Sequence, residues 1–229
     1  TRAAAALALG LLGERRATSP LVGALEDRTS EAPVRHAAAL ALAGIRDPAA
    51  IPALAGLLAE PDVVTVGLGV RALGESGRAE AVVSLVRLGA AIRQEVARLA
   101  RQSSVEAFAR HVEVLTTAIE VVRALGRLGD GRAWPLLEWA LGARPGGVAS
   151  VAELRLRERR WELRRAGVLA LAGMRDRAKA QRWLARQVAH GGGDYPEAME
   201  MALSNAIAQT WRGGATARGT TALSTTALS

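Results

Sequence analysis

Residues 39–47 read Ala-Leu-Ala-Leu-Ala-Gly-Ile-Arg-Asp, and they align without gaps with Ala-Leu-Ala-Leu-Gly-Leu-Leu-Gly-Glu at 6–14, 33 residues earlier. The pattern returns at 169–178, where Leu-Ala-Leu-Ala-Gly-Met-Arg-Asp-Arg-Ala repeats residues 40–49 almost letter for letter. Weaker copies begin at Leu73 and Leu125. Self-similarity at intervals of about 20 to 50 residues is typical of proteins built from stacked repeats. The sequence therefore predicts about five copies of one structural unit.

Each copy contains a leucine in an equivalent position, and a large apolar residue follows it twelve positions later. The register leucines are Leu9, Leu42, Leu73, Leu125 and Leu171, and the residues that follow them are Leu21, Leu54, Leu85, Leu137 and Trp183. We expect all of these side chains in the core, Trp183 included. The intervals between register leucines are 33, 31, 52 and 46 residues. The two longer intervals place extra residues around 88–112 and 142–165.

Each copy is predicted to form two helices. Small residues precede the register leucine by three and four positions, as Ala38 and Ala39 do, and share its helical face, so that a neighbouring helix can approach closely. A turn with Gly or charged residues follows, and then a second helix such as 48–60, in which Pro48 suits the first turn. Two helices cannot bury their apolar faces alone, so the copies are expected to stack into an all-α solenoid. Aromatic residues make up only 3% of the chain, which argues against a β-sandwich or barrel.

The second copy resembles a HEAT-like repeat of the phycobilisome-lyase type. The resemblance rests on Arg35-x-x-Ala38-Ala39-x-x-Leu42, on the following Gly-Ile-Arg-Asp-Pro turn and on Ile51-Pro-Ala-Leu54-x-x-Leu57-Leu58. It implies an α-solenoid of about five helix pairs plus a terminal helix over 1–212, with a binding role. We expect this domain to be part of a longer protein. Residues 213–229 are rich in Gly, Ala, Thr and Ser, and we expect them to be disordered.

Local signals predict several helix boundaries. Residues 79–101 fit one long helix, or two helices broken near Gly89. Ser103 and Glu106 fit a capping box for a helix that reaches Gly126. Ser150 is expected to cap the next helix, which runs to about Leu171. Residues 142–147 and 191–193 are expected to be loops, and a last helix is expected at about 196–211.

The positive charge of the chain lies mostly in one segment. The net charge is +8, of which residues 149–190 contribute +7. Arg157, Arg160 and Arg164 are spaced to form a line along one helix, with Trp161 beside them. Arg and Trp are frequent anchors of protein interfaces. The candidate partner-binding residues are Arg155, Arg157, Arg159, Arg160, Trp161, Arg164 and Trp139.

Three interpretations of this basic segment remain open. It is a solvated helix held by Glu–Arg pairs, a surface for an acidic protein, or a nucleic-acid site over residues 153–186. Basic residues confined to one helix pair are few for a protein that follows a duplex backbone. We therefore place an acidic protein partner ahead of nucleic acid. For the whole chain, the family resemblance implies a third function besides protein binding and nucleic-acid binding, a bilin lyase-like or chaperone role, although no chromophore-handling residue can be identified.

No residue pattern points to catalysis, and we expect neither a metal nor a cofactor. The three histidines, His36, His111 and His190, have no partner at metal-ligand spacing. Deoxyhypusine hydroxylase, a HEAT-repeat enzyme, binds iron through His-Glu pairs, and none of these histidines precedes Glu. The acids in the repeat turns, Glu14, Asp47, Asp130 and Asp176, are expected to cap the following helices and to meet arginines of neighbouring repeats.

The chain has no cysteine, and its early apolar stretch is too short to span a bilayer. We therefore expect a cytoplasmic protein without a membrane segment. The leading interpretation is a non-catalytic adaptor that binds a protein on its concave face and on the basic helix.

Overall fold

The computed structural model describes residues 2–143, 150–189 and 197–212. Within these ranges it contains eleven α-helices and no strand. The helices are α1 (Arg2–Leu12), α2 (Thr18–Glu26), α3 (Ala32–Ile45), α4 (Ile51–Gly56), α5 (Val63–Glu75), α6 (Ala81–Leu99), α7 (Val105–Leu128), α8 (Trp134–Leu141), α9 (Val151–Gly173), α10 (Arg177–Ala189) and α11 (Glu197–Arg212). The predicted all-α class is confirmed.

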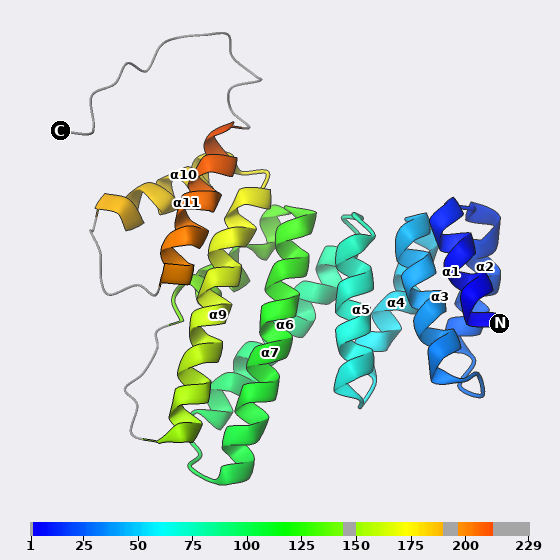
Figure 1. Cartoon of the computed structure of the whole chain (residues 1–229), viewed down its shortest axis with the longest axis horizontal. Coiled ribbons are helices and arrows are strands. Elements are labelled where there is room, and N and C mark those ends of the chain that lie inside the picture. The colour runs from blue at the N-terminus through cyan, green and yellow to red at the C-terminus, as the bar shows by residue number, and fades with distance from the viewer. Residues whose placement is uncertain (1, 144–149, 190–196, 213–229) are drawn as a thin grey trace.

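The helices form five consecutive pairs and a terminal helix, as predicted. The first helices of the pairs, α1, α3, α5, α7 and α9, each contact the next and form a row from one end of the molecule to the other (Figure 1). The second helices α2, α4, α6 and α8 also contact one another in sequence. The terminal helix α11 packs on α9 and extends the row of first helices. The chain is an α-solenoid.

The register leucines form the centre of the core. Leu42, Leu73, Leu125 and Leu171 are fully buried, whereas Leu9 in the end helix α1 is half-buried. Four of the five residues predicted twelve positions later are buried as well: Leu21, Leu54, Leu85 and Leu137. At the end of the row, α1 leaves Leu11 90% exposed and Leu12 79% exposed.

The prediction for Trp183 is wrong by one position. Leu184 is fully buried, and Trp183 is only half-buried against the core. The reason lies in the turn before α10. A three-residue hydrogen-bonded turn precedes each of the other four second helices, whereas α10 begins with an α-type bond from Ala180 N–H to the Asp176 carbonyl. Such tight turns rotate the chain by about 120° per residue against about 100° in an α-helix, so α10 needs one more residue to reach the core.

Small residues let the first helices approach closely. A Cβ atom at Gly126 of α7 would lie 2.6 Å from the Ala170 Cβ of α9, and one at Gly10 of α1 would lie 2.8 Å from the Ala41 Cβ of α3. Ala38 and Ala39 are fully buried, as predicted from their place before Leu42. These contacts define the spacing of the repeats.

The turn acids cap the helices that follow them. Asp47 and Asp130 accept hydrogen bonds from the backbone N–H groups of Ala49 and Arg132, at 3.0 and 2.9 Å, and Glu14 and Asp176 act in the same way. The expected arginines of neighbouring repeats reach backbone carbonyls instead. Arg78 Nε donates to the Arg46 carbonyl at 2.7 Å, and Arg132 Nη2 donates to the Ala79 carbonyl at 2.9 Å. The repeats are therefore joined by arginine–carbonyl bonds at their turns.

Several predicted boundaries are confirmed and others shift. α6 is one unbroken helix, and Gly89 lies within it against Leu136, where a Cβ atom would lie 2.3 Å from the Leu136 Cδ2. Ser104, not Ser103, caps α7 by accepting from the Ala107 N–H at 3.1 Å. The second helix expected at 48–60 is short, with α4 flanked by two 3₁₀ turns. Of the loop expected at 142–147, residues 144–147 lie outside the described residues, as do the loop expected at 191–193 and the tail 213–229.

Candidate binding surface

The basic helix α9 is longer than α1, α3 and α5, the first helices of the first three pairs. Ser150 and Glu153 form a capping box at its beginning, as Ser150 was predicted to do. Leu156 and Leu163 are buried on one face, while Leu154 is 43% exposed. α7 and α9 extend together below the rest of the row in Figure 1, which is where the long intervals between register leucines placed the extra residues.

The structure separates the seven candidate residues into different environments. At about 100° per residue, Arg155 and Arg159 lie on one side of α9, and Arg157, Trp161 and Arg164 lie on the other. Arg155 and Arg157 are exposed, and the remaining five are half-buried. Within the described part of the chain, Arg155, Arg157 and Arg160 form no ion pair.

Two of the arginines are engaged within the fold. Arg159 pairs with Glu162 one turn later. Arg164 donates to the Gln187 side chain of α10 at 3.3 Å, and its guanidinium lies 5.8 Å from the centre of the Trp161 ring. Arg35 plays a similar part in the second copy, where Arg35 Nε donates to the Leu25 carbonyl at 3.0 Å. The expected line of Arg157, Arg160 and Arg164 is therefore not a single free surface.

Trp139 lies apart from this group on α8, half-buried and packed against the core. Trp134, five positions earlier, is buried, and the Lys179 ammonium lies 4.3 Å from the centre of its ring. The two tryptophans thus face different ways, as their spacing predicted.

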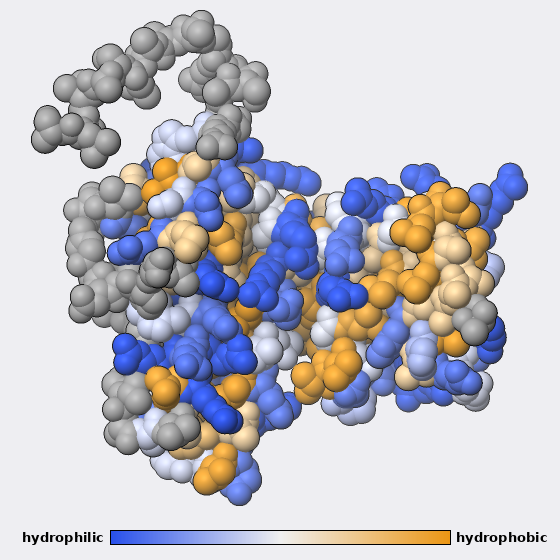
Figure 2. Space-filling view, viewed as in Figure 1, coloured by the Kyte–Doolittle hydropathy of each residue, from blue (hydrophilic) through white to orange (hydrophobic). Residues whose placement is uncertain are grey.

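An apolar groove runs between α7 and α9 beside Arg155. It encloses about 500 Å³ and is lined by Val105, Phe108, Ala109, Val112, Ala152 and Arg155. Val105 is 80% exposed at the beginning of α7. Figure 2 shows apolar patches next to strongly hydrophilic ones over the lower part of α7 and α9. An apolar centre with an arginine at its edge is the usual composition of a protein interface.

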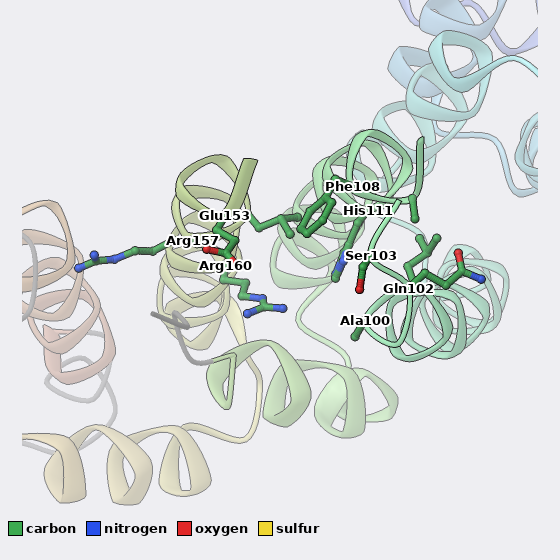
Figure 3. A pocket seen from close by; sticks show the side chains of 11 residues that line it. Ala100, Gln102, Ser103, Phe108, His111, Glu153, Arg157 and Arg160 are labelled. Carbon is green, nitrogen blue, oxygen red and sulfur yellow. The ribbon is translucent and has the colours of Figure 1, made fainter. Parts of the chain in front are cut away.

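A second, more polar pocket lies on the other side of Phe108. It encloses about 310 Å³ between α9, α7 and the segment that joins α6 to α7 (Figure 3). His111 of α7 lines it and is only 3% exposed, and its Nε2 atom has no hydrogen-bond partner. Burial, together with the positive charge of Arg160, lowers the pKa of His111 below its ordinary value of 6.5.

Val105, Phe108 and His111 line the groove or the pocket, and no sequence pattern marks them as residues of a binding surface. Phe108 is the only phenylalanine in the chain, and it borders both the groove and the pocket. His111 was considered only as a metal ligand. Among the described residues, no group of three or more acidic or histidine side chains could hold a metal ion. None of the described helices has the length and apolarity to cross a membrane.

Comparisons with known proteins agree with this architecture. Residues 1–74 match the family model for HEAT repeats. The search of the curated proteins found no match. Among solved structures, a chain of the complex of CpcE and CpcF of phycocyanin lyase from Nostoc sp. PCC7120 is 23% identical, with a TM-score of 0.52; the match covers 88% of this chain and 68% of that chain. Human deoxyhypusine hydroxylase is 19% identical with a TM-score of 0.37, over 92% of this chain and 79% of that one. Residues 1–74 thus match HEAT repeats, and the chain has a solenoid fold similar to that of a phycocyanin lyase chain.

Proposed function

We propose that this solenoid is a non-catalytic scaffold that binds an acidic protein through the surface formed by α7 and α9. The observation that supports this function best is the apolar groove edged by Arg155. A partner segment could bury apolar side chains against Val105 and Phe108 and place a carboxylate beside Arg155. Arg157 is exposed and without an ion pair among the described residues, and it adds positive charge on the adjoining side of α9.

The other candidate residues have supporting parts in this proposal. Arg159, Trp161 and Arg164 are half-buried; the ion pair of Arg159 with Glu162 and the contact of Arg164 with the Trp161 ring hold the surface of α9 in place. Arg160 of α9 and Trp139 of α8 complete the proposed partner-binding set. The solved relative is described as a complex of two chains, which supports a protein as the ligand of this kind of solenoid. A cytoplasmic location is part of the same proposal.

A nucleic-acid ligand is the second candidate, and the arrangement of the charges favours it less. A duplex-binding surface requires several cations that reach successive phosphates along one face. Here Arg155 and Arg157 lie on different sides of α9, and Arg159 and Arg164 already have partners within the fold. Few guanidinium groups on this part of α9 therefore remain to follow a phosphate backbone.

The capture of partners by the immobilised chain tests the proposal. The captured material is divided, treated with nuclease in one half, and analysed by mass spectrometry. We expect one acidic protein to be retained equally in both halves. Retention that disappears with nuclease would support the nucleic-acid alternative and contradict the scaffold proposal.

A further inference from the structure

We propose that the pocket between α9, α7 and the α6–α7 connection binds a small organic anion, with a carboxylate or phosphate group held by Arg160 and His111. Arg160 belongs to both proposals, but the groove on which the scaffold function rests and this pocket lie on different sides of Phe108. Each can be lost without the other.

The buried imidazole of His111 is the first observation. Its side chain is almost completely inaccessible, yet Nε2 lacks a hydrogen-bond partner within the described residues. A buried polar atom without a partner destabilises a fold by about 1–3 kcal/mol, so such atoms in native proteins usually meet a ligand or an ordered water. Nε2 can carry a hydrogen in the neutral or the protonated ring and can then donate it to an anionic oxygen.

The guanidinium of Arg160 is the second observation. It reaches from α9 into the pocket toward Ser103 and Ala100, whereas the guanidinium of Arg157 extends away on the other side of the helix (Figure 3). Arg160 forms no ion pair with any described residue. A planar guanidinium donates two parallel hydrogen bonds to a carboxylate or a phosphate, which makes such groups its preferred ligands.

The carboxylate of Glu153 also lines the pocket, and its negative charge opposes the positive charge of Arg160. Glu153 Oε2 accepts the backbone N–H of Ser150 at 3.1 Å in the capping box, so this carboxylate is held at the beginning of α9. Arg160 and a protonatable His111 face it across the pocket. Ser103 and Gln102 add neutral polar groups from the α6–α7 connection. The lining is thus suited to a single anionic group.

The remaining lining indicates the body of the ligand. Leu99, Phe108 and Leu156 supply apolar surface on three sides of the polar groups. The volume of about 310 Å³ lies at the lower end of the range for small-molecule sites. We infer a compact anion with an apolar or aromatic body, such as a substituted benzoate or an aryl phosphate.

The test is a titration of the full chain with benzoate, phenyl phosphate and neutral benzamide. The readout is the side-chain nitrogen resonances of His111, assigned by comparison with His111→Gln. We expect benzoate or phenyl phosphate to shift the Nε2 resonance and benzamide to leave it unchanged. The anion that binds more tightly shows whether carboxylates or phosphates are the natural class.

Two arginine variants make the assignment specific. Arg160→Gln should weaken binding of the anion by about tenfold or more, because a charged hydrogen-bond donor is lost. Arg16→Gln, at an exposed arginine of the first repeat that does not line the pocket, should leave the affinity within about twofold of the parent. Circular dichroism confirms that both variants are folded. The proposal is overturned if neither anion shifts His111 at millimolar concentration, which would leave water as its partner, or if benzamide binds equally well. Equal losses in the two arginine variants would also contradict it.

Discussion

Burial and the positive charge of Arg160 together lower the pKa of His111, and Arg160 and His111 line one pocket although they lie on different helices, α9 and α7. Sequence distance hides this relationship, since each residue belongs to a different repeat. The lengthened helices of the fourth and fifth pairs bring the two residues together. The surface that these helices add is where we place both the groove and the pocket.

The lowered pKa of His111 predicts a pH-dependent stability. The unfolded chain binds a proton at this histidine below its ordinary pKa of 6.5, while the folded chain resists it, so the free energy of unfolding should fall as the pH drops below 6.5. Glu153, Arg157 and Arg160 are the charged residues that line the pocket with His111, although the guanidinium of Arg157 extends away from it (Figure 3). Urea unfolding of the parent and of His111→Gln, in a cationic buffer between about pH 7 and pH 5, measures this slope. The variant should show a flatter dependence; parallel curves would be evidence against a buried neutral His111.

The close approach of α7 and α9 predicts a steric effect at Gly126. Gly126→Ala would place a methyl group against Ala170 and should destabilise the fold by about 1–3 kcal/mol. Gly67→Ala in α5 is the matched control, because no atom lies within 4 Å of its new Cβ. That control should be neutral or stabilising by up to about 1 kcal/mol, since alanine favours helices over glycine. Thermal unfolding of both variants measures this difference in stability. A Gly126→Ala variant as stable as the parent would show that α7 and α9 can move apart without destabilising the fold.

Asp130, in the turn before α8, and Asp27, in the turn after α2, predict a second pH transition at lower pH. Hydrogen bonds from Arg132 lower the pKa of Asp130 to about 2, and bonds from Thr29 and Ser30 lower that of Asp27 to about 2. Both groups stabilise the fold above their ordinary pKa of 3.8, and that contribution is lost as the pH falls toward 2. Asp130→Asn should therefore lose stability at neutral pH and show a shallower decline between pH 4 and pH 2. An equally steep decline in the variant would assign the acid transition to other groups.

The repeats and their helix pairs could be predicted because they depend on local sequence. Leu42, Leu73, Leu125 and Leu171 recur with a turn signal after each, and helix periodicity then fixes which side chains face the core. The cap at Ser150 followed from the same kind of local chemistry. The shift from Trp183 to Leu184 could not be predicted, because it depends on the hydrogen-bond pattern of one turn.

The candidate site was predictable only in part. The composition of α9 indicated a basic helix, and Arg155 and Arg157 are indeed exposed. The directions of the other side chains depend on which neighbours α9 meets. Arg164 meets Gln187 of α10, and Arg160 points toward the α6–α7 connection, so neither orientation follows from the spacing along α9. The groove at Phe108 likewise exists only when two helices from different repeats are side by side.

The separation of the arginines predicts weak binding to nucleic acid. Fluorescence anisotropy with labelled duplex DNA and RNA should show no appreciable binding at physiological salt. A true nucleic-acid protein would instead lose affinity as salt rises, and its log–log slope would shrink by about one for each phosphate contact removed. Measurable binding of DNA or RNA that weakens as salt rises, with a smaller log–log salt slope in Arg155→Glu/Arg157→Glu, would contradict the proposal of a protein partner.

The most direct test of the central claim compares partner capture by the parent chain and three variants after nuclease treatment. The double variant Arg155→Glu/Arg157→Glu reverses the exposed charge of α9, and Val105→Asp places a carboxylate in the groove. Because these side chains are exposed, the free energy of unfolding should change by less than about 1 kcal/mol in each variant. Arg16→Glu, an exposed charge reversal at the other end of the solenoid, is the control. The account predicts that one acidic protein, identified by mass spectrometry, is retained by the parent and by Arg16→Glu, and that about tenfold less of it is retained by the α9 and groove variants. Equal retention by all forms would contradict the claim that α7 and α9 form the binding surface.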